Sequence, residues 1–101
     1  MKLPKKIKIG YKTYEIKPWS ASDVACSDAY GCCDNDSQII YIYEDLDDLS
    51  KFDTLLHEIL HAIWNFADLP NDQEEEIVNR LATWLTLVAS ENPAWASLWS
   101  K

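Results

Sequence analysis

Residues 57–61 read His57-Glu58-Ile59-Leu60-His61, and this stretch decides how the rest of the chain is interpreted. On an α-helix, positions i and i+4 lie one turn apart on the same face. The side chains of His57 and His61 can therefore point at one tetrahedral zinc ion, with Glu58 beside it as a general base for a zinc-bound water. The sequence contains no other histidine. The pattern thus predicts a zinc site of the HExxH type.

The residues around this motif favour a buried helix. The stretch 52–66 contains neither Gly nor Pro, and most of its circumference is apolar, which is typical of a helix inside a protein. Ser50-Lys51-Phe52-Asp53 offers a capping signal at its start, and Leu69-Pro70 is expected to end it. Two histidines and a glutamate on such a helix need polar partners. A metal ion satisfies this need for all three.

Length and composition predict one globular domain over residues 1–101. The chain is 48% hydrophobic and has five Trp and five Tyr, enough to form a core at this size. The first six residues lead into a strand-like stretch rather than the apolar segment of a signal peptide. No run approaches the roughly 18 apolar residues of a membrane span. We expect a cytoplasmic protein without membrane contact.

Charge is distributed unevenly along the chain, with a net value of −8. Residues 1–18 hold six Lys and one Glu, whereas residues 19–101 hold three basic and sixteen acidic side chains. An acidic body lacks the basic footprint that binding to phosphates requires, so no nucleic-acid partner is expected. The three cysteines, Cys26, Cys32 and Cys33, form a poor disulfide framework because their number is odd and two are adjacent. Reduced thiols are expected.

The segments before the motif predict a small sheet. Residues 6–10 and 11–16 alternate apolar and polar side chains around Gly10, which indicates a β-hairpin closed by Lys17-Pro18. After a turn at 34–37, residues 38–43 are β-branched and aromatic, as in a strand that packs on the motif helix.

A second helix is predicted after the motif helix. It starts near residues 71–74 and runs to about Ser90, where Asn92-Pro93 ends it, and its apolar arc centres on Leu81. The tail places Trp95, Leu98 and Trp99 on one face, which we expect to lie in or over the core. The predicted fold is α+β: an antiparallel sheet of about three strands, the motif helix, a second ligand-bearing helix and a short helical tail.

The third metal ligand is sought in the second helix, since catalytic zinc has three protein ligands and one position for water. Residues 74–76 are all glutamates. Glu75 lies at the edge of the apolar arc in line with Ala82, where small side chains let another helix approach closely. Glu76 faces the far side with Arg80. We predict Glu75 as the third ligand and Glu76 as the second choice.

Two stretches together resemble a known group of enzymes, namely His57-Glu58-x-x-His61 and Glu75-x-x-x-Asn79-Arg80-Leu81-Ala82. They resemble gluzincins, most closely the minimal zincin metallopeptidases of the ImmA/IrrE type and small phage-encoded metallopeptidases. Those enzymes carry E-x-x-A-N-x-F-A, where this chain has Val78 for the Ala and Leu81 for the Phe. The resemblance covers residues 38 to about 92. It implies zinc on His57, His61 and Glu75, Glu58 as base, and the host cytoplasm if phage-encoded, but no substrate.

The predicted function is zinc-dependent hydrolysis of peptide bonds in a protein or peptide substrate. Zinc lowers the pKa of its bound water to about 7, and Glu58 takes up the proton. Tyr41, Tyr43 and Arg80 are open candidates for a second oxyanion donor. The strand over residues 39–43, if it lies at a sheet edge, could align an extended peptide.

Two other readings remain for the same residues. In the first, the chain is a non-catalytic, acidic, zinc-stabilised protein that binds or inhibits a host factor. In the second, the zinc is purely structural. Glu58 argues against both, because a structural site needs the histidines but not this glutamate.

Overall fold

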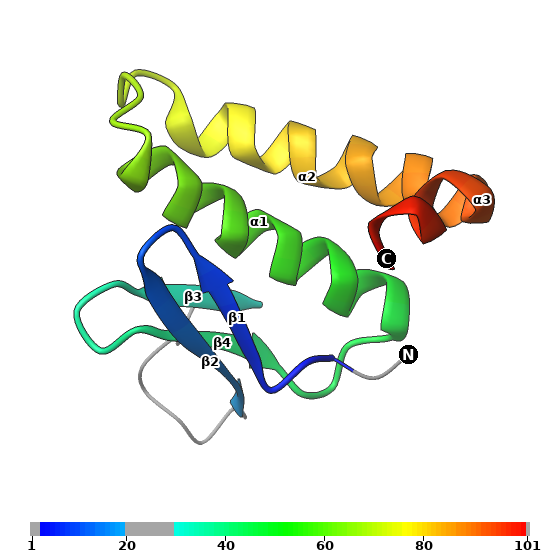
Figure 1. The fold of residues 1–101 in the computed structure, drawn as a ribbon, viewed down its shortest axis with the longest axis horizontal. Coiled ribbons are helices and arrows are strands. Elements are labelled where there is room, and N and C mark those ends of the chain that lie inside the picture. The colour runs from blue at the N-terminus through cyan, green and yellow to red at the C-terminus, as the bar shows by residue number, and fades with distance from the viewer. Residues whose placement is uncertain (1–2, 20–29, 101) are drawn as a thin grey trace.

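The computed structural model describes residues 3–19 and 30–100, which contain a sheet and a set of helices (Figure 1). The strands are β1 (Lys6–Ile9), β2 (Lys12–Trp19), β3 (Gly31–Asp34) and β4 (Ile39–Tyr43). The helices are α1 (Asp48–Phe66), α2 (Glu74–Glu91) and α3 (Pro93–Ala96), and the 3₁₀ helix η1 (Ser97–Ser100) follows. The predicted α+β class is confirmed.

The sheet has the order β1-β2-β4-β3 and is mixed. The predicted hairpin is present, with β1 antiparallel to β2 and Gly10 in the left-handed region at its turn (φ +61°). β2 is parallel to β4, and β3 is antiparallel to β4. The prediction of about three antiparallel strands is therefore wrong in number and direction. The local pattern of a strand does not encode which distant strand it pairs with.

β2 runs past the predicted end at Lys17-Pro18 and continues to Trp19. The backbone N–H of Glu15 donates to Gln38 on the β4 side, and that of Ile16 donates to Lys5 on the β1 side. Because these directions alternate along a strand, the nitrogen of Pro18 faces the β1 side beyond the end of β1. Its missing N–H therefore removes no bond from the sheet.

Helix α1 lies between the sheet and α2 (Figure 1). It buries Leu55 and Ala62 in the core, which also contains residues from three strands: Ile9, Tyr14, Ile40 and Ile42. The helix begins earlier than predicted, because Asp47 caps it by accepting the backbone N–H of Ser50 at 2.7 Å. Its outer side is less buried than expected, and Ile63 is exposed.

Helix α2 has nearly the predicted bounds but buries a different face. Its buried residues are Val78, Ala82 and Thr86, which form the seam toward α1. The arc predicted to be buried, centred on Leu81, faces solvent together with Trp84. Small side chains on the seam let the two helices pack closely. The buried face of α2 is therefore the one with small side chains, not the one with the largest apolar side chains.

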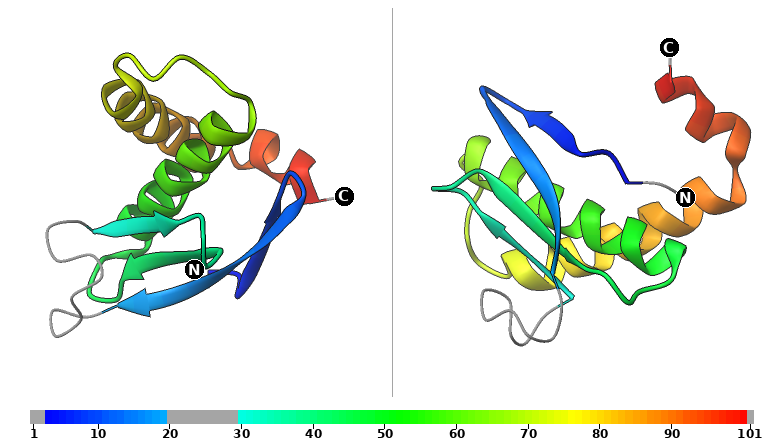
Figure 2. Two further views of the ribbon diagram at one scale, coloured as in Figure 1. Left: turned by 90° about the vertical axis from the view of Figure 1, so that its left-hand side faces the viewer. Right: turned by 90° about the horizontal axis from the view of Figure 1, so that it is seen from below.

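Among the described helices and strands, the C-terminal tail contacts α2 and itself (Figure 2). The rings of Trp95 and Trp99 meet edge to face, with centroids 6.0 Å apart. Both side chains are exposed, as is Leu98, so the expectation that they lie in or over the core is wrong. In the described part of the chain, no helix has the length and apolar character needed to cross a membrane.

Candidate metal centre

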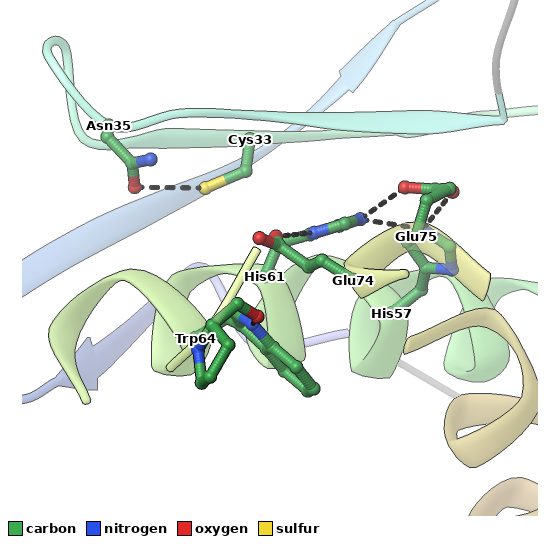
Figure 3. Close-up of polar contacts among 8 residues, drawn as sticks. Cys33, Asn35, His57, His61, Trp64, Glu74 and Glu75 are labelled. Atoms are coloured by element: carbon green, nitrogen blue, oxygen red, sulfur yellow. Dashed lines mark hydrogen bonds and ion pairs between the residues drawn. The ribbon is translucent and has the colours of Figure 1, made fainter. Parts of the chain in front are cut away.

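The structure brings the three predicted ligands together from two helices (Figure 3). His57 and His61 lie one turn apart on α1, with 3.1 Å between their Nε2 atoms. Glu75, in the first turn of α2, places Oε1 3.1 Å from His57 Nε2 and Oε2 2.7 Å from His61 Nε2. Glu76, the second choice, instead forms an ion pair with Arg80 at 2.7 Å.

The spacing of these atoms fits a single small cation. Two ligand atoms bound at about 2.0–2.1 Å to a tetrahedral ion are about 3.3 Å apart. The observed separations of 2.7 Å and 3.1 Å are slightly shorter, so a small opening of the group would admit an ion. Two imidazoles and one carboxylate are a ligand set of catalytic zinc. The residues present therefore fit a metal ion.

The group is open on one side. The side chain of Glu75 is 74% exposed, whereas those of His57 and His61 are 17% and 22% exposed. A cavity of about 460 Å³ adjoins it, and its wall is mostly polar. The lining includes Gly31 and Cys33 of β3, Asn35, Asn65, Asn71 and Glu58. A metal ion held here would keep a position that water can reach, which separates a catalytic from a closed structural site.

Glu58 is the buried acid of this site, only 6% exposed although it lines the cavity. Burial is the main reason that the pKa of its carboxyl rises from 4.5 to about 7; the charge of His61 opposes this rise, and that of Glu75 adds to it. A carboxyl group with a pKa near neutrality can both take up and return a proton at physiological pH. This is the property that the predicted base requires.

Gly31 sets the distance between β3 and α1 next to Glu58. A Cβ at this position would lie 2.6 Å from Thr54 Cγ2 and 2.7 Å from the carbonyl oxygen of Tyr41. Any side chain here would push the strand away from the helix. Glycine therefore lets β3 form the cavity wall beside Glu58.

The two histidines differ in their electrostatic surroundings. Burial lowers the pKa of His57 more than the nearby charge of Glu75 raises it. Burial also opposes protonation of His61, but the hydrogen bond with Glu74 and the charges of Glu75 and Glu58 outweigh it, so its pKa is raised. Metal binding requires neutral imidazoles, so it would displace a proton more readily from His57 than from His61.

Sequence reasoning considered Glu74 only as one of three candidate ligands and missed its contact with His61. Its Oε2 lies 2.6 Å from Nδ1 of His61, on the ring edge opposite the Nε2 that faces Glu75. The acidic triplet 74–76 was itself conspicuous in the sequence. Nothing local could show, however, that two of its members reach the same imidazole ring.

The proposed oxyanion donors do not reach the cavity. Tyr41 and Tyr43 belong to β4, which lies between β2 and β3 inside the sheet, and Arg80 is paired with Glu76. None of the three is among the described residues that line the cavity. The idea that residues 39–43 form a sheet edge is also wrong, because β3 is the outer strand beside α1.

The cysteines differ from the expected reduced state. Cys32 is disulfide-bonded and Cys33 is free, while Cys26 lies outside the described residues. A disulfide sulfur is not a thiolate ligand, so Cys32 does not close the metal site. Burial raises the pKa of Cys33 to about 11, with the charges of Glu58 and Asp34 adding to it. Because disulfides are rare in reducing compartments, this bond does not support the predicted cytoplasmic location.

No protein family, curated protein or solved structure matches this chain. The resemblance to minimal zincin metallopeptidases therefore rests on the motif residues and their spacing, and it stays a prediction.

Proposed function

We propose that this protein is a zinc-dependent metallopeptidase that hydrolyses peptide bonds with Glu58 as the general base. One observation carries the proposal: a water-accessible group of His57, His61 and Glu75 shares a cavity with a buried carboxyl group whose pKa is about 7. A structural zinc site needs neither the cavity nor Glu58. Zinc is favoured by the ligand set over harder cations, which prefer ligation by oxygen alone.

The roles of the side chains follow from their positions. His57, His61 and Glu75 would hold the zinc, which supplies a polarised water and a Lewis acid when bound. Glu58 takes a proton at its carboxylate and returns it to the leaving amine, as its pKa near neutrality permits. Its burial keeps bulk water from competing for that proton.

The edge strand β3 supports a peptide as the substrate class. β3 is the outer strand of the sheet on the side that lines the cavity. An edge strand carries unpaired backbone groups, and an extended peptide can add to it by backbone hydrogen bonds. A substrate aligned in this way would run past Glu58 and the three ligands. The peptide-aligning role thus passes from β4 to β3.

The alternative function is an acidic, zinc-stabilised binding or inhibitor protein that acts on a host factor without cleaving it. Its support is the net charge of −8 and the large apolar side chains exposed on α2 and the tail. A non-catalytic function does not explain why the carboxyl group of Glu58 is buried beside the metal ligands, so we rank this alternative second.

The variant Glu58→Gln separates the two functions. It preserves size and leaves the three ligands in place, but it removes the proton acceptor. Zinc content and turnover of a diverse peptide library, followed by mass spectrometry, are measured for wild type and variant. A peptidase should keep its zinc and lose about 10²- to 10⁴-fold in turnover. Glu76→Gln, an exposed carboxylate paired with Arg80, is the matched control and should stay active.

Three results would count against the proposal. Zinc-loaded wild type that cleaves no peptide in the library would favour the binding protein. Full turnover by Glu58→Gln would remove Glu58 from the mechanism. Loss of zinc from Glu58→Gln would make Glu58 a ligand and would contradict the assigned set.

A further inference from the structure

The carboxylate of Glu74 contacts His61 on the ring edge that faces away from the other two proposed ligands (Figure 3). Its Oε2 lies 2.6 Å from His61 Nδ1, and its side chain is 27% exposed, compared with 74% for Glu75. The more enclosed carboxylate, that of Glu74, is thus the one that contacts Nδ1 of His61. The more open carboxylate faces the Nε2 atoms of both histidines.

The start of α2 explains how neighbouring residues reach opposite edges of one ring. Gln73 precedes the helix in a left-handed conformation (φ 62°), so the first helical residue is Glu74. Successive helical residues point about 100° apart. Glu74 therefore reaches Nδ1 of His61 while Glu75 reaches its Nε2, and the two carboxylates bracket the imidazole.

A hydrogen bond at this position has a defined chemical consequence. Neutral imidazole carries one proton. Both ring nitrogens of His61 face a carboxylate oxygen, Nδ1 that of Glu74 at 2.6 Å and Nε2 that of Glu75 at 2.7 Å. A metal ion held by Nε2 and Glu75 would leave the proton to Nδ1, where Glu74 accepts it. With the proton on Nδ1 donated to Glu74, the lone pair of Nε2 is free for a metal ion. The same bond fixes the rotation of the ring about its side chain.

We propose that Glu74 is a positioning residue for the metal centre, which holds His61 in the Nδ1-protonated tautomer and in the ring orientation that binds the ion. This inference rests on the proposed metal site, but it assigns to Glu74 a role separate from that of a ligand. It implies that the adjacent pair Glu74-Glu75 provides one supporting and one coordinating carboxylate.

The test compares the variants Glu74→Ala and Glu74→Gln with wild type. Zinc affinity is measured by competition with a chromophoric chelator, and site geometry by the visible absorption of the Co²⁺-substituted protein. Glu74→Ala should bind zinc about 10- to 100-fold more weakly and alter the Co²⁺ spectrum. Glu74→Gln keeps an acceptor for the Nδ1 proton, so it should fall between alanine and wild type in both readouts. Glu76→Ala, which removes a carboxylate from the same turn, should match wild type.

The outcomes distinguish this inference from the proposed function. Wild type that binds no zinc would remove the metal site itself. Wild type that binds zinc no more tightly than Glu74→Ala would overturn only the role of Glu74. Binding lost as completely as in Glu75→Ala would make Glu74 a ligand, which also contradicts the inference. If Glu74→Ala does not fold in the metal-free state, Glu74→Gln decides, and an unchanged affinity overturns the proposal.

Discussion

The two helices that carry the proposed metal site are held in the molecule in different ways. α1 lies between two layers and buries Leu55 and Ala62 against the sheet. Apart from the tail, α1 is the only described helix or strand that α2 contacts, and Leu81 and Trp84 of α2 are 45% and 67% exposed. The first helix is therefore placed by hydrophobic burial, and the second by the close approach of small side chains.

This difference bears on the metal site, because the ligands are divided between the helices. The core should keep His57, Glu58 and His61 in place without an ion. Glu74 and Glu75 lie at the end of a helix with little burial of its own, so their position should depend more on their contacts with the histidines and on the metal. The fold therefore positions the residues of α1, whereas contacts with the histidines and the metal ion position those of α2.

The comparison predicts its largest contrast for two leucines. Leu55→Ala on α1 should lower the free energy of unfolding by about 2–5 kcal/mol, because it opens a cavity in the core. Leu81→Ala on α2 should change it by about 0.5 kcal/mol or less, as expected for an exposed site. Urea denaturation of both variants measures these values. Similar losses in the two would show that the outer face of α2 is covered in solution.

The buried acid of α1 predicts a pH dependence in metal-free protein. Glu58 has a higher pKa when folded, about 7, than its ordinary value of 4.5. Between these pH values the native state binds more protons, so the free energy of unfolding falls as pH rises, by about 3 kcal/mol in total. Glu58→Gln lacks this term and should gain stability over wild type from pH 4.5 to pH 8. A constant difference between the two proteins would show that folding does not raise the pKa of Glu58.

Metal removal should affect the two helices unequally. Zinc at 100 times its dissociation constant should stabilise the protein by about 2.7 kcal/mol, so chelation should lower the melting temperature. Hydrogen exchange of backbone amides should increase more over residues 74–78 of α2 than over residues 57–61 of α1. Equal increases would contradict the view that the fold alone holds α1, and an unchanged melting temperature would contradict metal binding.

The smallest expected effect concerns the seam itself. Thr86 is 3% exposed, and within residues 3–19 and 30–100 its hydroxyl oxygen has no hydrogen-bond partner. Thr86→Val keeps the shape and removes an unsatisfied polar atom, so it should raise the free energy of unfolding by about 1 kcal/mol. Thr83→Val is the control, since Thr83 is exposed and donates to Asp53 at 3.3 Å. A loss of stability in Thr86→Val would show that the hydroxyl is satisfied in solution.

Much of the candidate site was predictable from local sequence. The helical repeat alone places His57 and His61 on one face, because it depends only on residues four apart. Glu75 could be chosen because Ala82 lies in line with it and permits close helix packing. The supporting role of Glu74 could not be predicted, since it arises from a contact between residues 13 positions apart on different helices.

By itself, the sequence determined the α+β class, the hairpin around Gly10, the approximate extent of the two main helices and the residues that can bind a metal. These properties follow from periodicity, turn residues and side-chain chemistry, all of which act over a few positions. Only the tertiary structure decided that β4 is an inner strand, that β3 lines the cavity and that the arc around Leu81 faces solvent. Those outcomes depend on which segments, distant in the sequence, pack against each other. The free energy of such packing depends on both partners at once, whereas the local pattern of each segment describes that segment alone.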